Sequence, residues 1–366
     1  MEKTLIVIPT YNEKENIVRL IKAIKKEKVP ADILDVDDNS PDGTGKIVEK
    51  LSRYDKAIHV LHRKKKAGLG KAYIAGFKWG MDKGYKKMFS MDADFSHPHT
   101  ALKTMISLSK SDRIVIGSRY VKGGKIVGWS WPRYINSWGA NFVTRLLLQI
   151  KAKDATAGFK CYPVEFFKKI DLDKIQASGY AFQVEMLLKA QEAGFKLAET
   201  PITFTDRVAG ESKIQGELTK SAKVVFNLAA GKKSYRQFVK FTIVGAINTG
   251  VDWAVFYPAK AILLRGFSSL NLQTVRQIAK ASSFIVSALS SYIMNRKWTF
   301  RSKDARVARQ AAKFMTVSMG GLIINSTIFY IATAKLQWRD IFGLMMATAG
   351  ATLWNFFVNK KWTFRD

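Results

Sequence analysis

The fold is decided by the stretch Lys86-Lys87-Met88-Phe89-Ser90-Met91-Asp92-Ala93-Asp94, in which a short strand-like segment ends in two carboxylates. Similar short apolar runs recur along the first half of the chain, at residues 4–8, 33–36, 58–61 and 114–116. Amphipathic helical patterns lie between them, at residues 13–26 and 44–52. Strands that alternate with helices at this spacing predict a mostly parallel α/β sheet. Ligands of such sheets bind at the carboxyl ends of the strands, which is where Asp92 and Asp94 fall.

The pair Asp92 and Asp94 has the chemistry of a cation site. Two carboxylates one residue apart, on an extended backbone that turns, can converge on Mg²⁺ or Mn²⁺, which prefer hard oxygen ligands and also bind diphosphates. Such a cation neutralises the charge that develops on a departing nucleoside diphosphate. Asp-x-Asp also arises by chance in solvated loops, so its place after an apolar strand supports the prediction. We predict a metal site of Asp92, Asp94 and the hydroxyl of Ser96.

Two more polar segments follow predicted strands. After the first strand comes Pro9-Thr10-Tyr11-Asn12-Glu13, in which Tyr11 suits stacking on a base and Glu13 suits accepting hydrogen bonds. A simple helix cap explains this segment equally well. The second strand ends in Asp37-Asp38, where a turn is the simplest interpretation. Two adjacent carboxylates are costly to leave unpaired, which favours a ligand role for one of them.

From about Phe238 the pattern changes to apolar segments, at about residues 238–264, 276–296, 312–336 and 340–360. Each can cross a hydrocarbon core of about 30 Å at about 1.5 Å per helical residue. The stretch Asn295–Arg301, NRKWTFR, recurs as NKKWTFR at Asn359–Arg365, so we expect four membrane helices in two repeated pairs.

Composition narrows the class of partner. The 366 residues are 47% hydrophobic, and 60 Lys and Arg against 29 Asp and Glu give a net charge of +31. Such a charge suits nucleic acid, an anionic membrane surface or phosphorylated substrates. The basic residues flank the hydrophobic segments, and no nucleic-acid-binding module is recognisable, so we expect no nucleic-acid partner. The single cysteine, Cys161, excludes an intrachain disulfide.

Charge also predicts the orientation of the chain. Positive residues gather before the first apolar segment, between the second and third (Arg296 to Arg309), and at the C-terminal end. The apolar run at residues 5–8 is too short for a signal peptide. We therefore expect an integral membrane protein with its first domain and both termini on the cytosolic face.

Several motifs carry a family resemblance. Residues 9–13, 36–40 and 92–98 resemble family 2 glycosyltransferases. Gly117-Ser118-Arg119-Tyr120, residues 179–185 (GYAFQVE) and residues 207–213 (RVAGESK) are similar to the dolichol-phosphate mannose synthases within that family. The resemblance spans about residues 4–214, and the second half resembles the GtrA-like membrane domain that some such synthases carry.

The resemblance implies a fold and a domain plan. It implies a nucleotide-sugar-binding α/β domain of GT-A type, with a Rossmann-like, mostly parallel sheet, followed by an all-α four-helix transmembrane domain. We expect a catalytic domain at residues 1–213, an interface helix or linker at 214–237, and the transmembrane domain at 238–366.

It also implies an activity and a set of site residues. The activity is metal-dependent inverting transfer of mannose from GDP-mannose to dolichyl or another polyprenyl phosphate, for glycosylation. The donor-binding residues implied are Pro9, Tyr11, Glu13, Val36, Asp38, Asp92, Ala93, Asp94, Ser96, Arg119, Gln183, Arg207 and Lys213. The resemblance implies that the metal, Mg²⁺ or Mn²⁺, is bound by Asp92, Asp94 and Ser96. It implies catalytic roles for Asp94, Arg119, Arg133 and Arg207.

The basic residues in this set suit the chemistry. A polyprenyl phosphate is close to dianionic near neutral pH, so its oxygen is already a nucleophile and needs no strong general base. Positioning and charge compensation are what the transfer needs. Arginine suits phosphate because its guanidinium donates two parallel hydrogen bonds.

Two segments leave alternatives open. Residues 129–148 hold Trp129, Trp131, Arg133 and Trp138, which predicts either a helix at the membrane interface or a core helix. Asp35 places a carboxylate within the apolar second strand, at an edge or strand-end position or at a modest local cost.

The function has alternatives as well. The same motifs are compatible with a polyprenyl-phosphate glucosyl- or GlcNAc-transferase that uses a UDP sugar. The membrane half is also compatible with a lipid-carrier translocase or a docking module.

Overall fold

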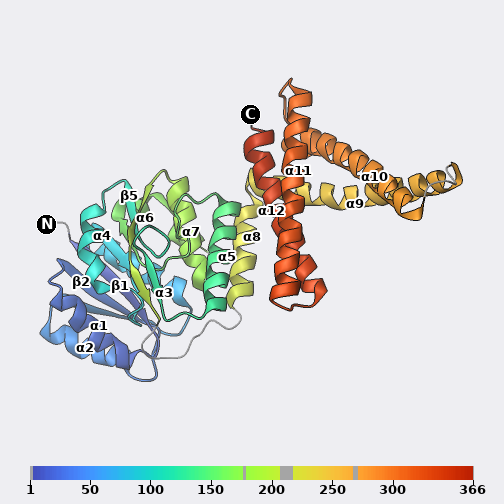
Figure 1. Cartoon of the computed structure of the whole chain (residues 1–366). Helices are drawn as coiled ribbons and strands as arrows, with labels where there is room; N and C mark the ends of the chain where they lie inside the picture. Colours follow the sequence, from blue (N-terminus) through green and yellow to red (C-terminus); the bar gives the residue numbers. More distant parts are fainter. Residues whose placement is uncertain (1–2, 176–178, 207–216, 267–270, 366) are drawn as a thin grey trace. The chain divides into compact units, whose positions relative to one another are not determined.

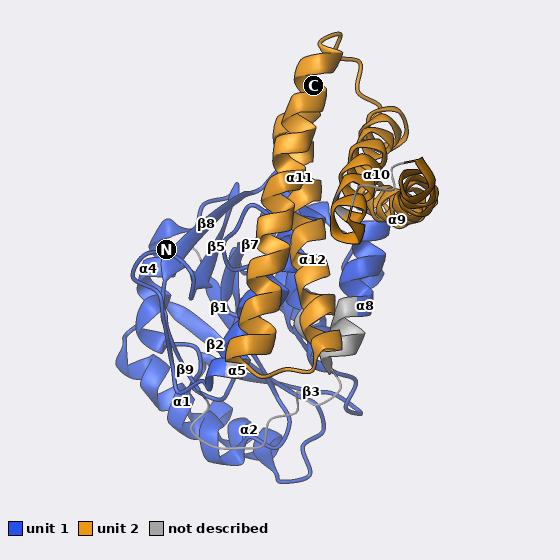
Figure 2. Cartoon of the chain, turned by 45° about the vertical axis from the view of Figure 1, so that its right-hand side comes forward, with its two compact units in different colours: residues 1–230 blue, residues 231–366 orange. Residues whose placement is uncertain are grey.

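The computed structural model describes residues 3–175, 179–206, 217–266 and 271–365. The chain forms two compact units, residues 1–230 and 231–366 (Figure 2). The predicted boundary at residue 213 falls within residues 207–216, outside the described part. Within the predicted interface helix or linker at 214–237, the structure has helix α8, Glu217–Ala230, which belongs to the first unit.

The first unit is built on a seven-stranded sheet with the strand order β3-β2-β1-β4-β7-β5-β8. Only β7 runs antiparallel to its neighbours, β4 and β5, so the predicted mostly parallel sheet is confirmed. A second, two-stranded sheet pairs β6 with β9. The strands are β1 Thr4–Thr10, β2 Ala31–Asp37, β3 Ile58–His62, β4 Lys87–Ser90, β5 Arg113–Ser118, β6 Lys125–Val127, β7 Lys160–Pro163, β8 Lys196–Pro201 and β9 Thr203–Thr205.

Helices cover both faces of the large sheet (Figure 1). Ile6 and Ile8 of β1 lie in one buried cluster with residues of α1 (Lys14–Lys26), α2 (Thr44–Tyr54) and α4 (Leu102–Leu108). On the opposite face, Gly76 of α3 (Leu69–Asp82) approaches so closely that a Cβ there would collide with Val7. Alternate residues of β1 thus pack against different helix layers, which is why its sequence is apolar throughout.

Three further helices complete this unit. They are α5 Trp131–Leu148, α6 Val164–Lys169 and α7 Gly179–Glu192. The α3 and α7 helices meet where the Tyr73 and Phe182 rings stack with their centroids 5.8 Å apart. Helices α5 and α8 pack side by side (Figure 1).

Asp35 lies in the interior of the sheet, so of the two alternatives for this residue the edge or strand-end position is wrong. The residue pairs with Ile8 on β1 and with Val60 on β3, and it is fully buried. Burial raises its pKa to about 7, although the Thr10 hydroxyl, 2.7 Å from Oδ1, opposes the rise by donating a hydrogen bond. The carboxyl group is therefore held in its protonated form well above the ordinary pKa of an aspartate.

The second unit consists of long helices. They are α9 Lys233–Gly266, α10 Leu272–Met294, α11 Val307–Tyr330 and α12 Asp340–Val358. Helix α9 runs beside α10, and α11 beside α12 (Figures 1 and 2). Of the described helices, Val307–Lys335 and Asp340–Thr363 are long and apolar enough to cross a membrane. Helices α9 and α10 are longer than many spans but more polar, and Asp252 of α9 pairs with Lys280 and Ser283 of α10, at 2.6 and 2.8 Å.

The two repeated segments adopt the same geometry. Lys240 lies 5.2 Å from the Trp298 ring and donates to the Trp298 carbonyl, and Lys313 makes both contacts with Trp362, also at 5.2 Å from the ring. Phe300 and Phe364, which match in the repeat, stack with centroids 4.5 Å apart. The sequence repeat is therefore also a repeat of contacts.

Candidate active site

A cavity of about 880 Å³ opens at the carboxyl edge of the sheet in the first unit. Of the residues that the resemblance assigned to the site, its wall holds Pro9, Tyr11, Glu13, Asp38, Asp92, Ala93, Asp94, Ser96, Arg119, Arg133 and Gln183. Val36 is instead fully buried within β2, with its side chain towards Gly76 of α3. Arg207 and Lys213 lie outside the described residues.

The two polar segments after β1 and β2 are joined into one wall. The Asn12 amide donates to the Ser40 hydroxyl at 3.1 Å, and the Glu13 amide donates to the Thr44 hydroxyl at 3.0 Å. Since these strands are neighbours and parallel, their carboxyl ends meet and the loops can exchange hydrogen bonds. Both segments therefore present their side chains to the same end of the cavity.

Asp38 binds the loop that follows β3, at residues 63–68, and holds it in this wall. Its carboxylate forms an ion pair with Arg63 and accepts a hydrogen bond from the Ala67 amide at 3.2 Å. The Lys66 ammonium then lies 3.9 Å from the centroid of the Tyr11 ring. Asp38 therefore keeps a lysine and an aromatic ring together at this end of the cavity.

Asp92 is held from two sides. The Tyr73 hydroxyl donates to its carboxylate at 2.8 Å, and His97 Nε2 lies 3.8 Å away. His97 Nδ1 accepts a hydrogen bond from the Asp92 amide at 3.0 Å. Burial lowers the pKa of His97, so the ring is neutral and its proton sits on Nε2, facing Asp92. The carboxylate is thus oriented by one donor, the Tyr73 hydroxyl, and His97 lies behind it and holds the backbone of Asp92.

Asp94 lies at the turn that follows. The Ser96 amide donates to Asp94 Oδ1 at 3.1 Å, and Phe95 between them adopts a left-handed φ of +63°. This turn brings Asp92, Asp94 and Ser96 to one stretch of the cavity wall. The three residues thus line one cavity, and their binding of a cation stays a prediction.

The donor set fits a cation that shares its ligands with a substrate. Among the described residues, no three His, Cys, Asp or Glu side chains gather into a complete metal-ligand group. Mg²⁺ commonly binds through one or two carboxylates together with waters and substrate phosphates. Two carboxylates and a hydroxyl at the wall of a large cavity match that mode.

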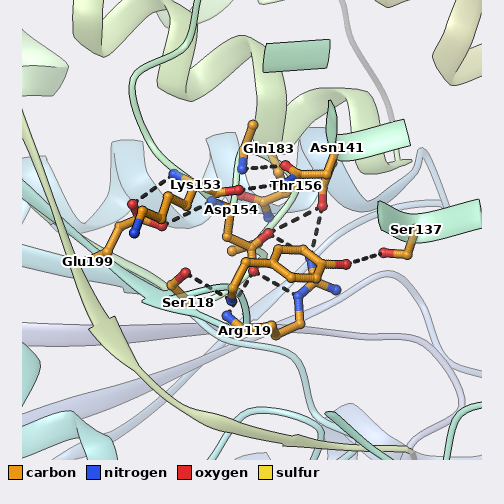
Figure 3. Close-up of polar contacts among 12 residues, drawn as sticks. Ser118, Arg119, Ser137, Asn141, Lys153, Asp154, Thr156, Gln183 and Glu199 are labelled. Carbon is orange, nitrogen blue, oxygen red and sulfur yellow. Dashed lines mark hydrogen bonds and ion pairs between the residues drawn. The ribbon is translucent and has the colours of Figure 1, made fainter. Parts of the chain in front are cut away.

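Arg119 is fixed by a buried carboxylate that sequence reasoning missed (Figure 3). Its Nε and Nη2 donate to the two oxygens of Asp154, at 2.8 and 2.7 Å, and Nη2 also donates to Thr156 at 2.8 Å. Asp154 is fully buried. Burial alone would raise its pKa, but the charge and hydrogen bonds of Arg119 outweigh that and hold the pKa below its ordinary value. The pair is therefore charged and rigid.

The loop that carries Asp154 is itself anchored. Glu199 accepts hydrogen bonds from the amides of Lys153 and Asp154, at 2.7 and 2.9 Å. Asn141 of α5 accepts from the Ala155 amide at 2.8 Å and donates to the Lys153 carbonyl at 2.6 Å (Figure 3). The position of Arg119 thus depends on contacts from β8 and from α5.

Arg133 lies in the first turn of α5, close to Arg119. It pairs with Asp206 at 2.5 Å, and its guanidinium lies 4.6 Å from the Trp129 ring, on which the Arg119 guanidinium also lies, at 5.6 Å. Both arginines line the cavity. The ring of Trp129 therefore joins the two positive groups in one wall.

The outer side of α5 is apolar and exposed. Trp131 and Trp138 are 72% and 51% exposed, and Tyr134, Ile135 and Phe142 are also exposed. A core helix would bury these side chains, so the core-helix alternative is wrong for this face. An exposed apolar face is what the interface-helix alternative predicts.

Sequence reasoning missed the residues behind the wall. Four of these residues form hydrogen bonds with residues of the cavity wall: Tyr73, His97, Asp154 and Lys160. His97 stood within a quoted motif, and Lys160 is a charged residue in an apolar strand, which is a usable signal. Tyr73 carries no such signal, since tyrosine is common in helices that cover a sheet.

Known proteins resemble both halves of the chain. Residues 5–171 match the family described as Glycosyl transferase family 2, and residues 240–364 match the GtrA/DPMS transmembrane domain. An undecaprenyl-phosphate mannosyltransferase of Micrococcus luteus is 41% identical over 222 residues, which cover 61% of this chain and 91% of the relative.

Two more relatives extend the comparison. A polyprenol monophosphomannose synthase of Mycolicibacterium smegmatis is 42% identical over 223 residues, 60% of this chain and 84% of the relative. A dolichol-phosphate mannosyltransferase of Pyrococcus furiosus is 31% identical over 341 residues, 90% of each chain. The last match runs through both units.

Proposed function

The chain belongs to the polyprenyl-phosphate mannosyltransferases of glycosyl transferase family 2, and we propose that it takes mannose from GDP-mannose with the help of a divalent cation. Its enzyme class is glycosyltransferase, and its second unit is a membrane domain. The acceptor is a polyprenyl phosphate, as in the names of the relatives.

One observation carries the proposal. The carboxylates of Asp92 and Asp94 line the same cavity as the guanidinium groups of Arg119 and Arg133. A cation site beside two arginines suits two phosphorylated substrates, because the diphosphate of the donor needs the cation and the acceptor phosphate needs positive charge. A hydrolase of simple sugars would need no second phosphate site.

The nucleotide end of the cavity receives the base and ribose. We assign Tyr11 to stacking on the base and Glu13 and Asp38 to hydrogen bonds from base or ribose. The Tyr11 ring lies beside Lys66 in the wall built from the loops after β1 and β2. We assign to Val36, whose side chain is buried in β2, a contribution through its backbone.

The chemical step rests on placement and charge. A cation would be held by Asp92, Asp94 and Ser96, and when bound it would compensate the charge of the leaving diphosphate. Arg119, fixed by Asp154, and Arg133, fixed by Asp206, orient phosphate oxygens. A phosphate oxygen of the acceptor attacks the anomeric carbon from the side opposite the diphosphate, which inverts the configuration. No general base is needed, since that oxygen already carries charge.

Membrane placement follows from the second unit and from α5. We assign the exposed aromatic face of α5 to the lipid surface, which places Arg133 at the depth of lipid phosphates. The basic residues at Arg296 to Arg309 and at the C-terminal end favour a cytosolic position of the first unit and of both termini. Arg207 and Lys213 complete the proposed phosphate-binding set.

A donor panel tests the proposal. Purified protein is incubated with a polyprenyl phosphate, Mn²⁺ or Mg²⁺, and radiolabelled GDP-mannose, UDP-glucose or UDP-GlcNAc, and the label is measured in the extracted lipid. We expect mannosyl lipid from GDP-mannose and little product from either UDP sugar. Preferential use of UDP-glucose or UDP-GlcNAc would establish the alternative donor class and overturn the assignment of GDP-mannose.

A further inference from the structure

Lys160 is a fully buried lysine behind the cavity wall. It lies on β7, between β4 and β5, with its ammonium directed to three oxygen acceptors. Nζ donates to the Ala157 carbonyl, to Gln183 Oε1 at 2.6 Å and to the Gln183 carbonyl at 3.4 Å. An ammonium has three protons, so these acceptors satisfy it. Burial lowers its pKa to about 7, against the pull of the Asp154 and Asp92 charges.

This contact decides which way the Gln183 amide points. In its charged form, which the Asp154 and Asp92 carboxylates favour, Lys160 only donates hydrogen bonds, so the oxygen of the Gln183 amide faces Lys160 and the NH₂ group faces away. Gln183 is itself buried and lines the cavity. In the described part of the chain, Nε2 of Gln183 has no hydrogen-bond partner. A buried donor without a partner is destabilising, so a ligand that accepts a hydrogen bond from it gains a matched contact.

We propose that Lys160 is a positioning residue: it holds the Gln183 amide with its NH₂ group towards the cavity, where that group donates a hydrogen bond to an oxygen of the nucleotide sugar. The oxygen is either a hydroxyl of the sugar or an oxygen of the diphosphate. This inference rests on the proposed function for the presence of a nucleotide sugar, and it does not depend on which base the nucleotide carries.

Two variants, Gln183→Glu and Gln183→Met, distinguish the loss of the NH₂ hydrogen-bond donor from a loss of stability. The glutamate keeps the shape and pairs with Lys160, but it presents an acceptor to the cavity instead of a donor. The methionine removes both functions without charge. We expect each variant to lower kcat/KM for the nucleotide sugar by about tenfold or more, with the Tm of Gln183→Glu equal to or above that of the wild type. Undiminished kcat/KM in both variants would refute the role of Gln183.

A double-mutant cycle tests whether Lys160 acts through Gln183. Lys160→Met frees the amide to turn, so we expect a similar loss of kcat/KM, about tenfold, in the wild-type background. In the Gln183→Met background the same change should add less than about twofold, because the orientation then has no group to act on. Additive losses would show that Lys160 acts independently and would overturn the proposal. Lys189→Met, on the exposed side of α7, is the matched control for removal of a lysine charge.

Binding measurements identify the oxygen. Titration calorimetry with Mn²⁺ present compares GDP, which lacks the sugar, with GDP-mannose. Weaker binding of GDP-mannose alone by Gln183→Met indicates a sugar hydroxyl, and weaker binding of both indicates the diphosphate. Unchanged binding of both ligands, together with an unchanged KM for GDP-mannose, would contradict the inference. If the wild type prefers a UDP sugar, the proposed donor fails, and the same variants are compared with UDP and that sugar nucleotide.

Discussion

Asp154 binds the guanidinium of Arg119 through both of its carboxylate oxygens, at 2.8 Å from Nε and 2.7 Å from Nη2. The carboxylate is completely buried, and the arginine side chain is only 8% exposed. An arginine expected from sequence to bind phosphate is thus held in a fixed plane before any substrate arrives. Such preorganisation lowers the reorganisation needed when charge develops.

Asp154→Asn should therefore damage both stability and transfer. Removing one partner of a buried ion pair leaves the other charge uncompensated, at a cost of roughly 3–5 kcal/mol. We expect a lower Tm and a lower kcat/KM for transfer, measured in the same detergent. Asp112→Asn is the control, because its pair with Lys196 lies at the surface, where ion pairs contribute little. A variant Asp154→Asn with wild-type Tm and activity would contradict the role of the pair.

Tyr73→Phe should weaken the cation site with little effect on the fold. The change removes only the hydroxyl that donates to Asp92 at 2.8 Å, and the buried ring still stacks on Phe182. Loss of a group that orients a ligand typically costs about 10- to 100-fold in metal affinity or activity. The measurement is the Mn²⁺ concentration that gives half-maximal transfer, which we expect to rise.

Tyr162→Phe is the matched control for that prediction. Tyr162 is also fully buried, but it lies on β7 against Phe77 and Phe166. We expect its Mn²⁺ dependence to equal that of the wild type. Equal shifts in both variants would show that the effect of Tyr73 comes from packing.

Asp35 should make stability fall as the pH rises. Its pKa in the folded chain is raised to about 7 from 3.8, so between these values the folded state holds a proton that the unfolded state has lost. Stability from this group is present in full below about pH 4 and is lost as the pH rises through about 7, with a span of at most roughly 4 kcal/mol. Asp35→Asn should flatten the fall of Tm between pH 5 and pH 8.

The control for this titration is Asp42→Asn. Burial would raise the pKa of Asp42, but hydrogen bonds from Thr44 outweigh it and keep the pKa below its ordinary value. Asp42 is thus ionised throughout the range from pH 5 to pH 8, and its loss should leave the slope of Tm unchanged. An unchanged slope in Asp35→Asn would show that the carboxyl group does not titrate in this window.

The exposed face of α5 should serve the lipid acceptor and not the nucleotide. Replacing Trp131 and Trp138 by serine removes two large apolar side chains from the surface. We expect a higher KM for polyprenyl phosphate in vesicles and an unchanged KM for GDP-mannose. Tyr54→Ser, at a 92% exposed position on α2, is the control for loss of an exposed ring. Equal KM values for the lipid in all three proteins would remove α5 from the acceptor site.

The residues at the strand ends were predictable from sequence because they directly follow short apolar runs in the chain. Short apolar runs followed by Glu13, Asp38 or Asp92 indicate parallel strands whose loops meet at one edge, and the structure places these residues around one cavity. The antiparallel strand β7 was not predicted, because no local pattern shows that Lys160–Pro163 runs against its neighbours. Its place between β4 and β5 depends on contacts distant in sequence.

The supports of the site escaped prediction for a similar reason. Asp154 lies 35 residues from Arg119 in the chain, and only the fold brings the two together. Asp35 was noticed as an anomaly, but the residue types around it do not reveal that β2 lies between two other strands. Sequence patterns predict which face of a helix or strand is buried. Which strands pair with each other, and which residues then come into contact, depends on the topology of the sheet.

Metal-dependent transfer by Asp94→Asn tests the central claim most directly. The measurement is the initial rate of mannosyl-lipid formation from GDP-mannose and polyprenyl phosphate, after EDTA treatment and stepwise return of Mn²⁺. We predict that the wild type loses its rate with EDTA and regains it with Mn²⁺. The variant, folded with a wild-type Tm, should stay roughly 100-fold slower at every Mn²⁺ concentration. A near wild-type rate in Asp94→Asn, or full activity of the wild type in EDTA, would contradict the account.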